Sequence, residues 1–382
     1  MDSSTSLSST DIRMELEGEE GELRKDDEFW FTDGNIVLIT RNVAFRVHQG
    51  VLSRHSDVFR DLFTVPQPAV QERMFDSPVV RLSDSASDLR HLLRVLYDGR
   101  RFYLMREDRL PFAAVEALVR LGQKYEIQDL REQGLVLLKA VFPDNFLAWN
   151  ASLKANSEDT STVVMETTDA IAAVNLARVI GCRSMLPAAL YRCCQLSAAE
   201  LCGGVSRGDG HTEQLSAEDV ERCIDAKARL MSAYAVGRMR RYSMASTDCL
   251  RKPMCAATMH SVLQRSVDSY PRRVKIQQCE TLDDMDRTID LRCKKHNLCD
   301  NCRQFIKTRD LERRRETWEH LPEYFGLDDW VQLQEGDSAS STSATICCIL
   351  GIVKSMQAQA IACRTYYRLL PFCAYSWSIK QP

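Results

Sequence analysis

The chain contains 382 residues, of which 45% are hydrophobic, and it carries 50 Lys and Arg against 53 Asp and Glu. This length is typical of about two or three domains, and the hydrophobic fraction can supply a buried core. The formal net charge of -3 provides no overall positive field for a phosphate backbone, which argues against nucleic acid as a partner.

The ends of the chain show no export or membrane signal. Residues 1–27 are polar and acidic, whereas a secretory signal needs a basic start and an apolar core, so we predict a disordered acidic tail. The apolar run 346–353 is too short to span a bilayer. We therefore expect an intracellular protein of the cytoplasm or nucleus, without a membrane partner. In such a compartment the 15 cysteines indicate reduced thiols or metal ligands.

The first elements after the tail alternate between strand and helix patterns. Ile36-Val37-Leu38-Ile39 and the alternating Val43, Phe45 and Val47 predict a β-hairpin. Ser56 is a suitable N-cap for a helix, and helical spacing recurs in residues 89–96 and 112–142.

The remainder of the chain is predicted to be mostly helical. Ser216 opens a long helix that extends to about Tyr242, after the Gly-rich loop 203–210. A last amphipathic helix extends from about Cys302 to Trp318. The region between these helices contains six cysteines, namely Cys249, Cys255, Cys279, Cys293, Cys299 and Cys302.

Several of these motifs occur in an order known from one family. They are Asp33-Gly34-Asn35-Ile36-Val37-Leu38, Phe45-Arg46-Val47-His48, Val51-Leu52, Ser56-Asp57-Val58-Phe59 and Leu62-Phe63. Together they resemble the opening of a BTB/POZ domain, and Leu121-Gly122-Gln123-Lys124-Tyr125-Glu126-Ile127 resembles its closing helical pair. The resemblance covers about residues 29–142. It implies an α+β BTB/POZ domain, which a mostly α-helical C-terminal region follows.

A second resemblance concerns the C-terminal half. Four segments of this half resemble a group of BTB proteins expanded in fungi. They are the helix from Cys223 to Tyr242, Asp248-Cys249, Leu298-Cys299-Asp300-Asn301-Cys302 and Trp318-Glu319-His320-Leu321-Pro322. We divide the chain into a tail (1–27), a BTB/POZ domain (28–142), a helical region (143–245), a Cys-containing helical region (246–335) and a linker with a poorly structured tail (336–382). Because residues 336–345 are rich in Gly, Ser and Thr, we expect deletion of 336–382 to leave stability unchanged.

Two cysteine pairs predict a zinc site. Cys299-x2-Cys302 can present two thiolates to one ion, and Cys249-x5-Cys255 can complete a tetrahedral set. Cys279, Cys293 and His296 are substitutes in this scheme. The alternative is that all these cysteines are buried reduced thiols, because cysteine is common throughout the chain.

Other candidate sites favour structural roles. His48 lacks a nucleophile and a carboxylate in a catalytic motif, so we interpret it as a packed histidine. Arg309, Arg313, Arg314 and Arg315 alternate with acidic residues, which predicts a solvated helix face rather than a nucleic-acid patch. No Gly-rich phosphate loop, Gly-x-Ser-x-Gly elbow or His-Glu-x-x-His helix occurs, so we predict no enzyme and no cofactor other than structural zinc.

The family resemblance implies that the chain binds proteins. BTB domains commonly homodimerise, and many recruit cullin-type ubiquitin ligases or transcriptional cofactors. The run Phe29-Trp30-Phe31 fits a dimer, since three successive rings cannot all lie on one face of a strand. The predicted function is a non-enzymatic protein-interaction scaffold that dimerises through its BTB domain. One such function is that of a substrate adaptor for a cullin-type ubiquitin ligase. The alternative is a transcriptional or chromatin regulator with a structural zinc site.

Overall fold

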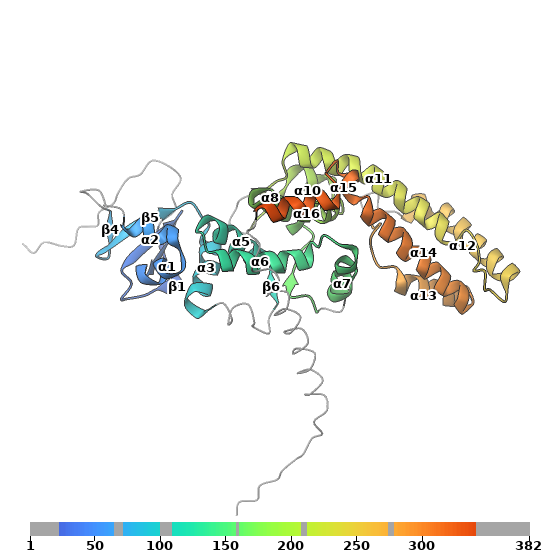
Figure 1. Cartoon of the computed structure of the whole chain (residues 1–382), viewed down its shortest axis with the longest axis horizontal. Helices are drawn as coiled ribbons and strands as arrows, with labels where there is room; N and C mark the ends of the chain where they lie inside the picture. Colours follow the sequence, from blue (N-terminus) through green and yellow to red (C-terminus); the bar gives the residue numbers. More distant parts are fainter. Residues whose placement is uncertain are drawn as a thin grey trace, which may run out of the picture. The chain divides into compact units, whose positions relative to one another are not determined.

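The computed structural model describes residues 23–64, 72–99, 109–157, 160–207, 212–273 and 279–340. These residues form two compact units (Figure 1). The N-terminal unit contains the described residues up to Arg131 together with Ser161–Asp169 and Val205–Glu213. The C-terminal unit contains Glu132–Thr160, Ala170–Gly204 and the residues from Gln214 onward.

The N-terminal unit is built on a mixed five-stranded sheet in the order β1-β3-β2-β5-β4. β2 and β3 form the predicted antiparallel hairpin, with Leu38 opposite Phe45, whereas β1 pairs with β3 and β5 pairs with β2 in parallel. The strands are β1 (Arg24–Trp30), β2 (Ile36–Thr40), β3 (Val43–Val47), β4 (Arg73–Met74) and β5 (Ser77–Leu82).

The predicted tail ended at residue 27, but β1 already begins at Arg24. Asp26 explains this difference, because its carboxylate is buried, accepts the backbone N–H of Phe29 (2.9 Å) and pairs with Nε of Arg90 (2.6 Å). An acidic residue that composition assigns to a solvated tail is therefore held in the fold by a specific cation.

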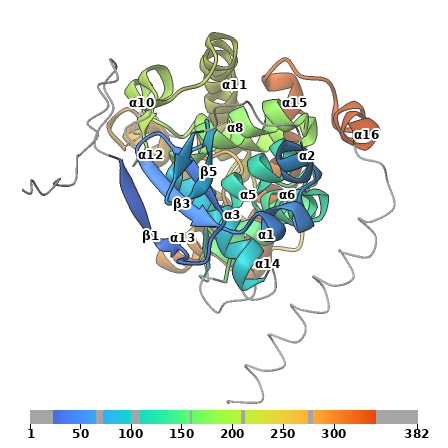
Figure 2. The same ribbon diagram turned by 90° about the vertical axis from the view of Figure 1, so that its left-hand side faces the viewer.

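The helices α1, α2 and α3 lie on one side of the sheet (Figure 2). Ser56 caps the second of them as predicted, since its hydroxyl oxygen accepts the N–H of Phe59 (3.1 Å). The boundary between the two units falls within α6, at Arg131. The helices of this half are α1 (Gln49–His55), α2 (Asp57–Thr64), α3 (Ala86–Asp98), α5 (Phe112–Lys124) and α6 (Gln128–Val141).

Two short strand pairs complete the N-terminal unit. β6 (Leu110–Pro111) pairs in parallel with β7 (Val163–Val164), and β8 (Val205–Ser206) pairs antiparallel with β9 (Thr212–Glu213). Next to β8, Nη2 of Arg207 pairs with Oε2 of Glu116 (3.2 Å). Burial raises the pKa of Glu116 to about 7, although Arg207 opposes this shift.

The C-terminal unit is helical, as predicted. The long helix after Ser216 is confirmed, and the hydroxyl of Ser216 accepts the N–H of Asp219 (3.1 Å). Its elements are α7 (Phe146–Ser157), α8 (Asp169–Ile180), the short helix η1 (Arg183–Met185), α9 (Leu186–Cys193), α10 (Ala198–Gly203), α11 (Ala217–Arg241), α12 (Lys252–Arg273), α13 (Asp286–Lys295), α14 (Asp300–Glu319), α15 (Leu321–Tyr324) and α16 (Trp330–Ser340). No helix among the described residues is long and apolar enough to cross a membrane.

Aromatic rings connect α14 with α7 and α16. The ring of Trp318 stacks on Trp330 with centroids 4.9 Å apart, and it also contacts Trp149 (5.3 Å) and Phe146 (6.4 Å). The indole N–H of Trp330 donates to the backbone oxygen of Trp318 (2.9 Å). Rings of this size bury large apolar areas, so they account for much of the packing between these helices.

A buried ionic cluster joins α11 to α14. Asp310 is 1% exposed, and its two carboxylate oxygens pair with Nη2 of Arg241 (2.7 Å) and Nε of Arg314 (3.0 Å). Nη2 of Arg313 lies 3.6 Å from the same carboxylate and donates to the backbone oxygen of Thr281 (2.7 Å). The prediction of a solvated face is therefore wrong for Arg313 and Arg314, which are buried.

Gly237 of α11 makes room for this cluster. A Cβ at this position would lie 1.8 Å from Cδ of Arg313. Any larger residue would therefore displace the Arg313 side chain from its place against α11.

We expect Asp310→Asn to destabilise the C-terminal unit. The substitution leaves three buried guanidinium groups without their carboxylate, and removing one partner of a buried ionic pair costs about 3–5 kcal/mol. Denaturant unfolding followed by circular dichroism measures the change. Glu218→Gln is the matched control, since its side chain is 71% exposed and its pair with Arg222 is of the surface kind. Equal unfolding midpoints for the two variants would contradict the proposed role of Asp310.

The predicted linker at 336–345 begins inside a helix, because α16 continues to Ser340. Asp337 lies on this helix, where its carboxylate accepts the hydroxyl of Ser184 (2.6 Å) and pairs with Nζ of Lys139 (3.0 Å). The contacts of Asp337 thus hold residues 336–340 in a helix, although their Gly and Ser content predicted a linker. Residues 341–382 lie outside the described part of the chain.

These contacts overturn the expectation that deletion of 336–382 leaves stability unchanged, and we expect two truncations to differ in stability. A chain ending at Glu335 loses Asp337 and the last residues of α16, whereas a chain ending at Ser340 keeps them. The shorter chain should unfold several degrees lower, because hydrogen bonds to a charged group contribute about 1.5–3 kcal/mol each. Thermal unfolding of both chains tests this, and identical melting temperatures would show that the contacts of Asp337 add nothing.

Candidate metal centre

Four cysteine sulfurs meet in the C-terminal unit. The Sγ atoms of Cys249, Cys255, Cys299 and Cys302 all lie within 4.8 Å of one another, and those of Cys249 and Cys299 are 3.5 Å apart. In a regular ZnS4 tetrahedron with Zn–S bonds of about 2.3 Å, the sulfurs are about 3.8 Å apart. The cluster therefore has the dimensions of a four-thiolate metal site.

The first two cysteines flank the turn from α11 into α12. The N–H of Cys249 donates to the backbone oxygen of Ser246 (3.2 Å), which reverses the chain, and Cys255 lies in the first turn of α12. The N–H of Cys255 donates to the oxygen of Arg251 (2.9 Å). A turn followed by a helical start thus places two sulfurs on one side of the backbone.

The other two cysteines occupy the start of α14. Cys299 is the N-cap residue and Cys302 lies in the first turn, where free backbone N–H groups and the helix dipole favour negative charge. Asn297 has a φ of 52°, and this left-handed conformation ends α13 and turns the chain toward α14. The Asn301 side-chain amide donates to the backbone oxygen of Asp248 (2.6 Å), joining the two halves of the cluster.

The cluster is enclosed by apolar side chains. Cys302 and Cys255 are almost fully buried, and Cys299 is partly exposed. The apolar neighbours come from the residues just after α11 and from α12, α13 and α14, and they include Tyr242, Met259, Val262, Ile289 and Ile306. Exclusion of water around thiolates strengthens their interaction with a cation.

The four thiols differ in acidity. Burial raises the pKa of Cys299, but the N–H of Cys302 and hydrogen bonds from the neighbouring sulfurs outweigh burial and lower it to about 7. Burial raises the pKa of Cys255 and of Cys302. Without a cation, Cys299 therefore ionises more readily than Cys255 and Cys302. A bound divalent cation would lower the pKa of all of them, as a coordinating thiol is deprotonated outright.

The substitutes named from the sequence lie elsewhere. The thiol of Cys279 donates to the backbone oxygen of Lys227 (3.8 Å), and Cys293 packs in the apolar surroundings of the cluster without belonging to the four-sulfur group. His296 is also outside that group. The structure thus brings together the four cysteines that spacing selected, and zinc binding itself stays a prediction.

A second group of thiols lies apart from the four-sulfur cluster. Cys193, Cys194 and Cys223 are all fully buried between α9 and α11. Hydrogen bonds from Cys193 and Cys194 lower the pKa of Cys223 to about 5. The thiol of Cys194 also donates to the backbone oxygen of Cys223 (3.5 Å), so these groups satisfy one another within the core.

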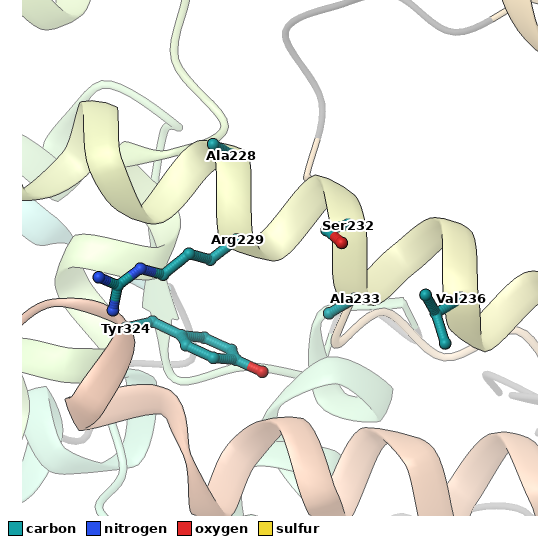
Figure 3. A pocket seen from close by; sticks show the side chains of 6 residues that line it. All are labelled: Ala228, Arg229, Ser232, Ala233, Val236 and Tyr324. Carbon is teal, nitrogen blue, oxygen red and sulfur yellow. The ribbon is translucent and has the colours of Figure 1, made fainter.

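A shallow groove of about 550 Å³ follows one side of α11 (Figure 3). Small side chains form its wall, and Arg229 and Tyr324 lie at one end. The guanidinium of Arg229 donates to the backbone oxygen of Glu323 (3.3 Å). Among the lining residues no nucleophile is paired with a base.

His48, in the N-terminal unit, has structural partners. Its Nδ1 lies 3.0 Å from the hydroxyl of Tyr97, and its Nε2 lies 3.3 Å from Oδ1 of Asp33. The backbone N–H of His48 donates to the same hydroxyl (2.9 Å), and the ring contacts Phe31. These contacts fix the end of β3 against α3, as expected for a packed histidine.

The aromatic run of β1 is divided between the two faces of the sheet. Phe29 is buried and Phe31 stacks on Tyr97 with centroids 4.9 Å apart, so these rings cover α3. Trp30 covers the opposite face, where it contacts Phe75 (5.2 Å), which is 49% exposed. One ring of the three therefore lies on the sheet face opposite the helices, where it packs against the domain's own sheet.

The fold and these surfaces can be compared with known families. The model of the BTB/POZ domain family matches residues 23–140. The chain carries a BTB/POZ domain. No curated protein and no solved structure matches the chain. The BTB domain is a protein-interaction domain, and a mostly helical region follows it, as the sequence predicted. The four-sulfur cluster lies outside the matched residues, so the family comparison does not assign it.

Proposed function

We propose that this chain is a non-enzymatic protein-interaction scaffold in which a BTB domain dimerises and a zinc ion organises the helical region. The BTB domain carries the first part, because its family binds other proteins. Four sulfurs within 4.8 Å support the second part. The protein would thus consist of one protein-interaction domain and one helical unit that a zinc ion stabilises.

The donor set favours a structural role for zinc. Structural sites are closed by four protein ligands, whereas catalytic sites keep one position open for water or substrate. Four thiolates leave no open position, and their soft sulfur donors disfavour hard cations such as Mg²⁺, which take oxygen ligands. Zinc here would cross-link the α11–α12 turn to the start of α14 and stabilise both.

We expect the purified full-length chain to contain about one zinc per molecule when no chelator is used. Structural thiolate sites bind with about 10–16 kcal/mol, so the ion should survive purification. Metal analysis by mass spectrometry measures it. Cys299→Ser and Cys302→Ser should each remove the ion and lower the unfolding midpoint of the helical region.

Cys202→Ser is the control for these variants, because Cys202 is exposed and lies outside the cluster. It should keep the zinc content of the unaltered chain. Less than about a tenth of an equivalent of zinc in the unaltered chain would defeat the zinc proposal. Disulfides seen in the intact mass without reductant would identify an oxidised alternative.

The dimer proposal rests on the surface of the BTB domain. β1 is an edge strand of the sheet, and the Trp30–Phe75 pair leaves apolar rings on the sheet face opposite the helices. Lys25 lies over both rings, with Nζ 4.9 and 4.4 Å from their centroids. Two-fold pairing is the commonest closed assembly of soluble oligomers, and it would cover such a patch.

We expect the full-length chain to have a light-scattering mass near twice the chain mass. Phe75→Asp and Trp30→Asp should shift it toward monomer, because each would place a charge in an apolar contact. Phe75→Asp is the cleaner variant, since Phe75 has a φ of 50° in a turn that Asp adopts readily. Val164→Asp, at another exposed apolar position, should remain dimeric. A monomer at tens of micromolar would refute the dimer.

As a scaffold, the chain would serve as a substrate adaptor for a cullin-type ubiquitin ligase. Proteins that co-purify with the tagged chain from its own cells distinguish this role from others. Cullin and ubiquitin machinery would support the adaptor. Chromatin proteins would instead support a transcriptional or chromatin regulator with a structural zinc site.

A further inference from the structure

Large apolar side chains are exposed beside the four-sulfur cluster. Leu250 follows Cys249 directly and is 96% exposed, and Met254 precedes Cys255 and is 56% exposed. Met244, five residues before Cys249, is 57% exposed. Single exposed apolar residues are ordinary, whereas these three fall within eleven residues of the chain, in the α11–α12 turn and the first turn of α12. We call residues 238–254 the cysteine corner.

The backbone of the cysteine corner is held in place while these side chains remain exposed. Cys249 is fixed by the cluster and by its hydrogen bond to Ser246, and Cys255 begins the helical hydrogen bonding of α12. Leu250 lies two residues before α12 and Met254 lies in its first turn, so both side chains are carried by backbone next to the cluster. A preorganised backbone lowers the entropic cost of binding to these side chains.

The cysteine corner is also positively charged. It contains Arg238, Arg240, Arg251 and Lys252 against one acidic residue, Asp248, which gives four minus one, or +3. Arg241 is left out of this sum because it is buried and paired with Asp310. The exposed Lys294 and Lys295 at the end of α13 add two positive charges, and the exposed Asp300 at the start of α14 subtracts one.

The acidity of His296 agrees with this local field. Burial lowers the pKa of His296, and the nearby cations Arg265, Lys295 and Arg292 lower it further. Positive charge from α12 and from α13 therefore converges next to the start of α14.

We propose that the cysteine corner docks an acidic amphipathic segment of a partner protein. Apolar side chains of that segment would cover Leu250, Met254 and Met244, and its carboxylates would face the basic residues around them. This inference deepens the proposed scaffold function and rests on it. Methionine side chains adapt to varied apolar partners, which suits recognition of a helix face.

Peptide display tests the proposal. A library of random 16-residue peptides is selected on the zinc-loaded full-length chain, and recovered peptides are synthesised with a fluorescent label for affinity measurement. We expect them to combine Asp or Glu with apolar residues at helical spacing. Leu250→Ser and Lys252→Glu should each weaken binding about tenfold or more, because they remove an apolar contact or reverse a charge at the surface.

Leu147→Ser is the matched control, since Leu147 is 76% exposed on α7 of the same unit. It should leave the dissociation constant within about twofold, as expected for a surface residue outside the contact. Recovered peptides that lack acidic residues, or that bind Leu250→Ser as tightly as the unaltered chain, would overturn the proposal. Recovery of no binding peptide would also overturn it.

Two further measurements distinguish peptide docking from binding to a lipid surface and from the zinc proposal. Sedimentation with vesicles of phosphatidylcholine and phosphatidylserine tests a lipid surface, and vesicle binding that depends on Leu250 without any acidic peptide would replace the docking proposal. Zinc content is measured on the same protein batch. If the purified chain contains no zinc but still selects acidic peptides, the docking proposal stands and the zinc proposal fails. If the chain contains zinc but selects no peptide, only the docking proposal fails.

Discussion

The carboxylate of Asp310 is shared by buried guanidinium groups, and the arrangement of α11 and α14 depends on it. Arg241 is the last residue of α11, and Arg313 and Arg314 lie one turn beyond Asp310 on α14. The remaining guanidinium nitrogens extend to other parts of the unit, with Nη1 of Arg314 donating to Oδ1 of Asn150 on α7 (2.5 Å). Desolvating these charges is costly, so we interpret the cluster mainly as a device that fixes one arrangement of the helices.

The four-sulfur cluster lies where α14 meets the turn that follows α11. Cys249 follows Arg241 by eight residues, and Cys302 precedes Asp310 by eight residues. Eight residues of α-helix extend about 12 Å, so α14 meets the end of α11 at Asp310 and the α11–α12 turn at Cys302, about 12 Å apart along its axis. One attachment alone would leave α14 free to rotate about it. The ionic cluster sets how the helices pack, and the sulfurs set where the α11–α12 turn lies.

The sequence predicted those features that neighbouring residues encode. The hairpin around Asp33-Gly34 and the cap at Ser56 depend on nearby residues, and Cys299-x2-Cys302 is a local motif. The burial of Arg313 and Arg314 could not be predicted, because alternating charges on a solvated helix have the same pattern. The available signal was Gly237, a helix-interior glycine that makes room for Arg313. The exposure of Leu250 also depends on tertiary structure, since an apolar residue next to a cysteine is usually expected to be buried.

The BTB domain and the cysteine corner would act together through valency. A BTB dimer carries two cysteine corners, and each corner alone offers a small contact of three apolar side chains with a few charges. Such a contact binds weakly, because the cost of association consumes most of its energy. A partner with two acidic segments on a linker of matching span would make the second contact intramolecular, raising affinity by about 10²–10⁴. Dimerisation would then select partners that can bind both corners at once, and the positive charge of each corner would select acidic segments.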